Sequence, residues 1–473
     1  MAALAVGTNV IYLVWLALVV RQPIGYLFLV LETGIFGLVL LFAVNHRRRR
    51  VQVFGGTYSL RAIVDVFVTV TNEPIDILGP TVRAAAAIEY PNKRLYILDD
   101  GGRPEVERLA KRVGATYLHR PNRKGNPCKA ANLNFGLSHS FGNFVLVLDS
   151  DQVVKPQIAD ELLGFFKDPK VAFVATRQRF SVDHHNFNND HVFYEYMQTG
   201  KDADDAAISC GSGVIYRRSS LTAIGGFQEW NLVEDLYTSY VLHSHGYTSI
   251  YTNQSYTLGE APSDLGVIYK QRRTWATDTL RLWIWKAPLF NRNLSLRQRL
   301  HYFEIGYIYI VSGLVIPAVY LLNFYSLAVN HPILVGVSWW YLLFKLPALV
   351  TSLKLYDELG QGSASSRMWA ALFPVFFSAF IRALLYRKNG YHLTAKGLKP
   401  GRHLGLIMPQ IGFIGIGLLL VVYHLTHYGL TTLLAVNALW LGLMIYWLWS
   451  IIPMALHGSD SVQPGPAKTR YAN

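Results

Sequence analysis

Charged residues are scarce in this chain of 473 residues. Aspartate, glutamate, lysine and arginine make up 16% of the sequence, whereas a soluble globular protein carries about 25%. The deficit is uneven, because long apolar runs lie toward both ends and the charges lie in the middle. This distribution argues against an ordinary soluble protein and favours one soluble domain inserted between membrane segments.

Cysteine is nearly absent as well. The two cysteines, Cys128 and Cys210, both lie in the charged middle of the chain. Two residues cannot form the framework of several disulfides that stabilises small secreted domains. We therefore expect reduced thiols in a cytosolic setting.

Acidic residues are outnumbered by basic ones, with 30 Asp and Glu against 44 Lys and Arg, a formal net charge of +14. The basic residues flank apolar runs and do not form a stripe on a soluble module. Such an excess is typical of the cytosolic ends of membrane helices and of contact with anionic lipid. We expect a lipid bilayer as a partner and no nucleic acid.

Six apolar runs are long enough to cross a bilayer, since a spanning helix needs about 20 apolar residues. They cover residues 3–20, 24–44, 302–329, 333–353, 404–425 and 430–456. A further apolar stretch, 368–386, contains Arg382 and is followed by two more basic residues. We interpret it as an amphipathic helix at the membrane interface.

The loops between these runs differ in charge. The turns 328–331 and 424–428 carry no lysine or arginine, whereas four arginines occupy 47–50 and basic residues gather between 387 and 402. Lysine and arginine accumulate in cytosolic loops. We therefore predict about six spans with both termini and the charged middle domain in the cytosol.

The charged middle alternates β-rich and helical segments. We predict strands over 64–70, 95–99, 143–149 and 171–176, and helices over 75–89 and 129–140. Such alternation is typical of a largely parallel sheet covered by helices, and ligands bind beyond the carboxyl ends of its strands. The predicted domains are two N-terminal membrane helices (1–46), a cytosolic α/β domain (61–290), a C-terminal membrane region (296–456) and a disordered tail (457–473).

Acidic residues follow two of the predicted strands. Asp149 and Asp151 end an apolar strand, and two carboxylates one residue apart suit a hard cation such as Mg²⁺ or Mn²⁺. That cation would bridge them to a nucleotide diphosphate. Asp99 and Asp100 follow an earlier strand, where they either form an ordinary acidic turn or contact a nucleotide.

Two later motifs can each be explained either by ordinary helix or membrane structure or by a function in the site. Glu234 and Asp235 begin a predicted helix, where the helix dipole favours acids; a glycosyl transfer also needs a base for the acceptor hydroxyl. Arg272, Arg273 and Trp275 combine phosphate-binding guanidinium groups with an indole that can stack on a sugar. A basic segment with an interfacial tryptophan would look the same.

The order of these motifs carries more information than any one of them. The strings are VTNEP (70–74), YILDDGGRPE (96–105), KAANLN (129–134), LDSD (148–151), SCGSGVIYRR (209–218), GGF (225–227), VEDLYTSYVLHSHGY (233–247) and QRRTWAT (271–277). As a set, they resemble the family-2 inverting glycosyltransferases, most closely the catalytic subunit of bacterial cellulose synthase. The resemblance extends from about residue 64 to residue 399. It implies an α-helical transmembrane bundle with an inserted cytosolic α/β nucleotide-sugar-binding glycosyltransferase domain.

The resemblance implies a set of donor-binding residues. The UDP moiety and its diphosphate would be bound by Glu73, Asp99, Asp100, Lys129, Asp149, Gln271, Arg272 and Arg273. Asp149 and Asp151 would also hold Mg²⁺ or Mn²⁺, the expected cofactor.

The resemblance also implies the acceptor side of the site. Asp235, with Glu234 beside it, would act as general base on the acceptor hydroxyl. Cys210 and Gly211 would lie beside the acceptor sugar, and Trp275 would stack under the terminal sugar. Direct displacement inverts the anomeric carbon, so an α-linked donor yields a β-linked product.

A further match lies after the interfacial helix. The string YHLTAK (391–396) resembles the family's gating loop, within 388–401, in which Thr394 and Lys396 would contact the nucleotide. Such a loop would act as a lid that excludes water.

The implied function is processive polymerisation of a β-linked glucan from UDP-glucose at the bacterial inner membrane, with translocation of the growing polysaccharide. Thr274 stands where the family has arginine, which leaves β-1,4, β-1,3 and mixed linkages open. A polymerase using UDP-GlcNAc or UDP-glucuronate, a transferase of one sugar to a lipid phosphate, and a periplasmic export partner are also left open. A transporter with a soluble insert is disfavoured, because the sequence has no internal repeat.

Overall fold

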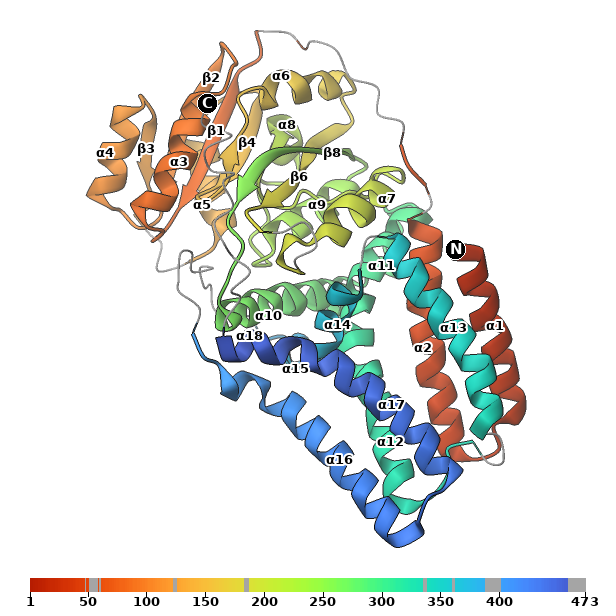
Figure 1. Cartoon of the computed structure of the whole chain (residues 1–473). Helices are drawn as coiled ribbons and strands as arrows, with labels where there is room; N and C mark the ends of the chain where they lie inside the picture. The colour runs from red at the N-terminus through yellow and green to blue at the C-terminus, as the bar shows by residue number, and fades with distance from the viewer. Residues whose placement is uncertain are drawn as a thin grey trace.

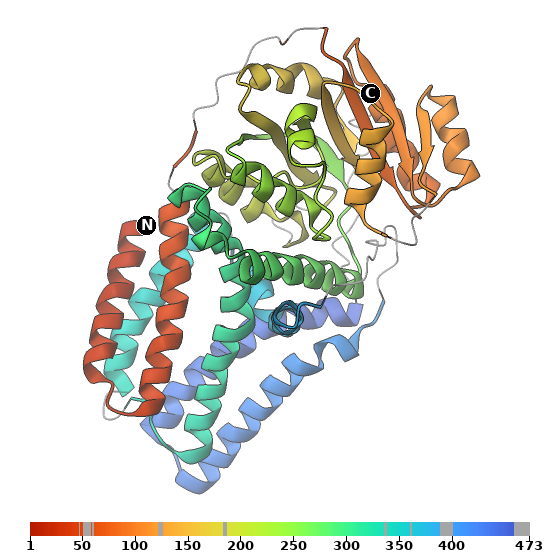
Figure 2. The same ribbon diagram turned by 180° about the vertical axis from the view of Figure 1, so that it is seen from behind.

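The computed structural model describes residues 1–46, 48–50, 58, 61–121, 126–182, 187–334, 338–359, 362–387 and 401–457. An α/β domain forms one end of the molecule and a bundle of long helices forms the other (Figures 1 and 2). The N-terminal helices α1 (Ala2–Val19) and α2 (Pro23–Asn45) belong to the bundle, although the α/β domain follows them in sequence. Two of the predicted lid residues, Thr394 and Lys396, lie outside the described residues. The predicted disordered tail also lies outside them, apart from its first residue, His457.

Five helices are long and apolar enough to cross a membrane. They cover Ala2–Val19, Pro23–Asn45, Leu296–Val329, Leu404–Tyr428 and Thr432–Leu456. These agree with five of the six predicted spans. The predicted interfacial helix corresponds to α14 (Gly362–Ala371) and α15 (Phe373–Leu384); the bend between their apolar parts is 54°, and a sixth span results if the pair is counted as one.

The remaining predicted span corresponds to α13 (Ser338–Glu358), which is not among those five helices. Lys345 and Lys354 interrupt its apolar sequence. Nevertheless α13 packs lengthwise on α1, where Asn9 donates a hydrogen bond to Ser352 (2.9 Å). The predicted span over 333–353 stays a prediction, with α13 lying beside the apolar helices α1 and α2.

The sheet of the α/β domain has eight strands in the order β3-β2-β1-β4-β7-β6-β8-β5. The strands are β1 (Val64–Val70), β2 (Lys93–Asp99), β3 (Thr116–His119), β4 (Phe144–Asp149), β5 (Val153–Val154), β6 (Val171–Phe180), β7 (Val214–Arg217) and β8 (Thr248–Gly259). Neighbours among β3, β2, β1 and β4 run parallel, whereas β7 is antiparallel to both β4 and β6. The four predicted strands are present as β1, β2, β4 and β6.

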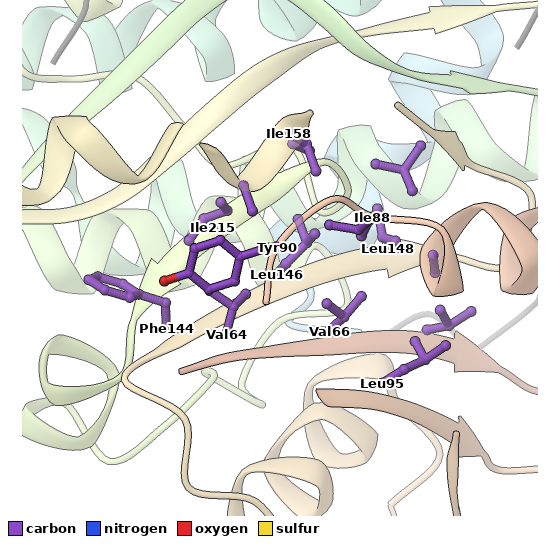
Figure 3. Close-up of a cluster of buried hydrophobic side chains, with 14 of the residues drawn as sticks. Val64, Val66, Ile88, Tyr90, Leu95, Phe144, Leu146, Leu148, Ile158 and Ile215 are labelled. Carbon is purple, nitrogen blue, oxygen red and sulfur yellow. The ribbon is translucent and has the colours of Figure 1, made fainter. Parts of the chain in front are cut away.

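The strands β1 and β4 are buried on both faces of the sheet, which explains their near-continuous apolar sequences. On one face, Val66, Leu146 and Leu148 join a core that also holds residues of α3 (Ile75–Ala86) and α6 (Ile158–Leu163) (Figure 3). On the other face, Phe67 and Val147 pack with residues of α5 (Lys129–Ser138). Helices on both sides therefore fix the strand ends from which the site is built.

The described residues of this domain contact the helical bundle in several places. Helix α10 (Leu265–Arg281) lies between the domain and the bundle and shares an apolar core with α15 (Figure 2). A buried polar joint lies elsewhere, where Glu304 of α11 (Leu296–Ile310) accepts hydrogen bonds from Asn45 (3.0 Å) and, at 2.7 Å, pairs with His46. The ammonium of Lys201, in α7 (Gln198–Asp202) of the α/β domain, lies 3.8 Å from the same carboxylate.

We predict that Leu146→Ala destabilises the α/β domain, because the side chain is fully buried in the centre of the core. A leucine-to-alanine change of this kind costs about 2–5 kcal/mol. A lower thermal midpoint of the detergent-solubilised protein would register the loss. Phe141→Ala, at a ring that is 66% exposed, serves as the control and should cost about 1 kcal/mol or less. Equal shifts for both variants would contradict the assigned core.

Candidate active site

A cavity of about 940 Å³ opens beyond the carboxyl ends of the parallel strands. The register pairs Val70 of β1 with Asp99 of β2 and Thr69 with Asp149 of β4. The acidic motifs that follow β2 and β4 are thus held on either side of β1. This is the place where ligands bind in such sheets.

The two aspartates after β2 have different surroundings. Asp99 is fully buried, and its carboxylate accepts hydrogen bonds from the backbone N–H groups of Gly101 and Arg103, both at 2.8 Å. It shapes the loop and does not line the cavity. Asp100 does line the cavity, where Arg120 holds its carboxylate with two hydrogen bonds of 2.9 and 2.7 Å.

The loop after β1 lies against the loop after β2. Glu73 lines the cavity and its carboxylate accepts the N–H of Thr71 (2.7 Å). Arg103 donates to the Glu73 carbonyl (2.7 Å), which ties the two loops together. A Cβ added to Gly101 would lie 2.0 Å from the Thr71 carbonyl oxygen, so only glycine allows this approach.

Lys129 lies at the centre of the site. Its ammonium, at the first residue of α5, is 2.6 Å from a carboxylate oxygen of Asp149 and 3.3 Å from one of Glu234, and it donates to the Gly211 carbonyl (2.8 Å). Burial alone would lower the pKa of Lys129, but the carboxylates of Asp149 and Glu234 outweigh it and hold this pKa above its ordinary range. One positive charge therefore gathers three segments that lie far apart in the sequence.

The segment that carries Cys210 and Gly211 has an unusual backbone. Both residues adopt positive φ, 59° and 76°. The Cys210 carbonyl accepts from Gln178 (2.6 Å), and burial raises the pKa of the Cys210 thiol. A Cβ on Gly211 would lie 3.2 Å from both a carboxylate oxygen of Asp235 and the Lys129 ammonium, so glycine keeps this space open.

Glu234 and Asp235 form the first turn of α9 (Glu234–Ser244). Burial raises the pKa of Glu234 to about 7, with the Lys129 ammonium opposing the shift and the Asp235 carboxylate adding to it. Burial likewise raises the pKa of Asp235, against the effect of Lys129. Carboxylates with raised pKa values at a cavity are suited to proton transfer near neutral pH.

Asp149 and Asp151 both line the cavity, as the sequence predicts for a pair that shares a cation. The Asp149 carboxylate is partly exposed, and Asp151 accepts the backbone N–H of Glu260 (3.0 Å). Among the described residues, no three His, Cys, Asp or Glu side chains are grouped to hold a metal. Two carboxylates facing one cavity fit Mg²⁺ or Mn²⁺ when a nucleotide diphosphate supplies further oxygen ligands.

The QRRTW motif lies on α10, and Gln271 through Trp275 all line the cavity. The buried guanidinium of Arg272 is bound by both carboxylate oxygens of Asp190 (2.7 and 2.9 Å) and lies 4.8 Å from the Trp275 ring. The Asp190 carboxylate therefore holds the Arg272 guanidinium next to the Trp275 ring. Arg273 has a pKa lowered by burial and by the neighbouring Arg382.

Sequence reasoning missed a link between α10 and the end of the predicted lid. Asp264 caps the start of α10, pairs with the imidazole of His403 (2.7 Å) and accepts the Gly401 N–H (3.0 Å). Asp264 and His403 both line the cavity. An acidic residue before a helix signals a cap, but no local pattern marks His403.

The same cavity reaches the helical bundle. Ile305, Ile308 and Tyr309 of α11 and Trp369 of α14 line it together with the acidic residues described above. A second cavity of about 260 Å³ lies within the bundle, and Ile308 and Trp369 line both cavities.

Comparison with known proteins identifies the domain. Residues 62–277 match the family described as glycosyltransferase-like family 2. Cellulose synthase 1 of Komagataeibacter xylinus is 29% identical over 375 residues, which cover 74% of this chain and 24% of the relative. The UDP-forming cellulose synthase catalytic subunit of Pseudomonas fluorescens is 30% identical over 358 residues, which cover 71% of this chain and 47% of the relative.

These relatives are longer proteins, and the chain spans between about a quarter and a half of their length. A solved mannosyltransferase of Pyrobaculum calidifontis, in complex with GDP-mannose and Mn²⁺, aligns with a TM-score of 0.57 at 18% identity, over 75% of this chain and 97% of that one. This likeness shows a shared fold. Residues 62–277 thus form a glycosyltransferase family 2 domain, in a chain that is similar over most of its length to proteins named cellulose synthase catalytic subunits.

Proposed function

We propose that this protein is a processive, inverting glycosyltransferase that polymerises a β-linked glucan from UDP-glucose on the cytosolic side of a bacterial inner membrane and passes the chain through its own helices. One observation carries the proposal. A single cavity is lined by the acidic motifs of the glycosyltransferase domain and by residues of the apolar bundle. A polymer that grows at this site would already have its leaving end directed toward the bundle.

The donor would lie along the loops after β1, β2 and β4. Glu73 and Asp100 line the part of the cavity that these loops form, and Asp100 is held in place by Arg120. Asp149 and Asp151 would bind Mg²⁺ or Mn²⁺, which would neutralise charge on the leaving UDP. Lys129 would then exchange its contact with Asp149 for one with the diphosphate.

The acceptor would approach from the opposite side. Trp275 offers an indole face to the terminal sugar, and the clamp of Asp190 on Arg272 keeps that region of α10 in place. Asp235 would take the proton from the acceptor hydroxyl as its oxygen attacks the anomeric carbon and UDP leaves. Attack opposite the leaving group converts an α-linked donor into a β-linked product.

The segment 388–401 is proposed as the lid over the bound donor, with Thr394 and Lys396 as nucleotide contacts. The bonds of Asp264 to His403 and Gly401 support this placement, because they hold the end of that segment at the cavity. The lid would exclude water from the activated donor.

The proposal is tested with protein reconstituted in vesicles and supplied in turn with labelled UDP-glucose, UDP-GlcNAc and UDP-glucuronate. We expect high-molecular-weight product from UDP-glucose, and digestion with β-1,4- and β-1,3-specific glucanases gives the linkage. Label that appears only in an organic-extractable lipid would instead identify a transferase of single sugars to a lipid phosphate.

Replacing the base should abolish polymer formation and spare donor binding. For Asp235→Asn we expect the rate to fall by about 10²–10⁴-fold, the range for loss of a general base. UDP affinity, measured by calorimetry, should stay near the wild-type value. Asp168→Asn, at an exposed position outside the cavity, is the matched control. Polymer synthesis at the wild-type rate by the Asp235 variant would refute the assignment.

The buried acid pair should also give the reaction a pH dependence. The base must be deprotonated, and burial raises the pKa of Glu234 to about 7 and that of Asp235 as well. We therefore expect kcat/KM to rise through neutral pH and to fall by about tenfold per pH unit on the acid side. In Glu234→Gln, Lys129 has one carboxylate fewer to neutralise, so it stabilises the charged form of Asp235 more. The pKa of Asp235 should then fall, and the acid limb of the pH profile should move to lower pH. A limb that stays in place would show that the two acids do not interact.

A further inference from the structure

The two groups proposed to act on the acceptor lie on different helices. Asp235, the proposed base, is in the first turn of α9, whereas Trp275, the proposed sugar contact, lies on α10 at the boundary with the bundle (Figure 1). The distance between them decides whether a hydroxyl of a sugar on the indole reaches the base. A displacement of about 1 Å can lower the rate by about 10²-fold. A contact that fixes the start of α9 against α10 would therefore control the rate without touching the substrate.

Asp278 makes such a contact. It lies on α10 about one turn after Trp275, and its side chain is fully buried. Its carboxylate accepts the backbone N–H of Leu232 at 2.9 Å. Leu232 precedes Glu234 and Asp235 in the same stretch of chain, so the hydrogen bond holds the backbone that leads directly into the acid pair.

Asn231 attaches the same loop to α10 a second time. Its amide group donates to the carbonyl of Asp278 (2.9 Å), and its side-chain oxygen accepts the N–H of Val233 (2.9 Å). Val233 caps α9, and its carbonyl accepts the N–H of Tyr237 (3.2 Å). The loop 231–233 is thus bound to both the side chain and the backbone of Asp278, and it continues without a break into α9.

Arg281, one turn further along α10, orients the Asp278 carboxylate. It donates to Oδ1 of Asp278 (2.8 Å), while Oδ2 accepts the Leu232 N–H. The guanidinium is buried and lies 4.6 Å from the Trp230 ring centre and 5.1 Å from that of Tyr386. Each carboxylate oxygen has its own partner, so the side chain is held in one orientation. Neither Asp278 nor Arg281 lines the active-site cavity.

The burial of this ion pair is not explained by stability alone. An apolar pair of similar size is commonly as stable as a buried ion pair, or more so. An apolar side chain at position 278 would, however, leave the Leu232 N–H without its acceptor. What the aspartate adds is therefore the direction of one hydrogen bond to the loop in front of the acids.

We propose that Asp278 is a positioning residue, whose hydrogen bond to the Leu232 N–H sets the distance between Asp235 and Trp275. The proposal rests on the proposed function, which gives Asp235 and Trp275 their roles. The donor would be held by the loops after β1, β2 and β4, which are separate from the loop 231–233. Loss of the hydrogen bond should therefore lower kcat and spare donor binding.

The test compares two double variants that differ only in this hydrogen bond. Asp278→Leu/Arg281→Met removes the acceptor, whereas Asp278→Asn/Arg281→Met retains an oxygen for the Leu232 N–H on a side chain of similar shape. Both leave no unpaired charge at the site of the ion pair, so both should fold. The protein is reconstituted in vesicles with labelled UDP-glucose, and the readout is all label transferred, to polymer and to extractable lipid together. Rates are divided by the number of UDP-binding sites found by calorimetry, so unfolded protein is not counted.

We expect kcat of the Leu variant to fall by about 10²-fold, the effect of a misplacement of about 1 Å. The KM for UDP-glucose and the UDP affinity should stay near their wild-type values. The Asn variant should recover much of the rate, because its amide oxygen accepts the Leu232 N–H.

A second buried aspartate provides the matched control. Asp65, near the amino end of β1, is also fully buried and accepts both a backbone N–H, from Gly142, and the guanidinium of Arg218 (2.7 Å). It lies at the end of the strand opposite to the site. Asp65→Leu/Arg218→Met removes contacts of the same kind and should leave kcat per UDP-binding site unchanged.

Two results would overturn the positioning role. One is a wild-type kcat per UDP-binding site in the Leu variant of Asp278. The other is an equal loss in its Leu and Asn variants, which would mean that the hydrogen bond to Leu232 has no effect on the rate. The proposed function fails separately, if wild-type protein transfers label only to extractable lipid; the ratio of the two variants would still measure the positioning effect.

Discussion

The contact of Lys129 with Asp149 and Glu234 is the interaction on which the site depends. It joins the start of α5, the end of β4 and the start of α9, and its bond to the Gly211 carbonyl adds the loop before β7. Without this cation, the carboxylates of Asp149, Glu234 and Asp235 would lie together in a partly buried space. Their mutual repulsion would then open the cavity. Under the proposed function, an incoming diphosphate would offer Lys129 negative charge and would free Asp149 for a cation. The ion pair would thus hold the site in shape until the diphosphate replaces Asp149 as the partner of Lys129.

A second constraint acts between the two parts of the molecule. Helix α10 carries Trp275, the proposed acceptor contact, and it packs on α15 through an apolar core. The joint of Glu304 with Asn45, His46 and Lys201 fixes the other side of the contact. Under the proposed function, a polymer extended one sugar at a time would have to meet the proposed base in the same geometry at every step. These separate contacts between the α/β domain and the bundle would help to keep that geometry, because a single contact would leave a hinge.

The sequence predicted those parts of the fold that rest on long apolar patterns. Strand β1 was predicted to the residue, since its seven residues are buried on both faces. The strands β3, β5 and β7 were missed because they contain four, two and four residues, and β8 because polar residues interrupt it. In the site, the motifs name segments whose described predicted residues line one cavity, with Asp99 as the exception. They could not show that Asp99 turns into its own loop, because that depends on the backbone N–H groups it meets.

The QRRTW motif shows most clearly what spacing cannot decide. Arg272 and Arg273 are equal candidates for a diphosphate contact in the sequence, and Thr274 stands where the resemblance implies an arginine. In the folded chain, the two arginines are successive residues of α10 and therefore point in different directions from the helix axis. Arg272 is bound at both ends of its guanidinium by Asp190, a residue 82 positions earlier, so it acts as a support for Trp275. Arg273 instead lies at the cavity with a pKa lowered by burial and by Arg382, which means that a nearby anion would relieve its surroundings. Under the proposed function, Arg273 would therefore supply the cation that the resemblance places at position 274, shifted by one position along the helix.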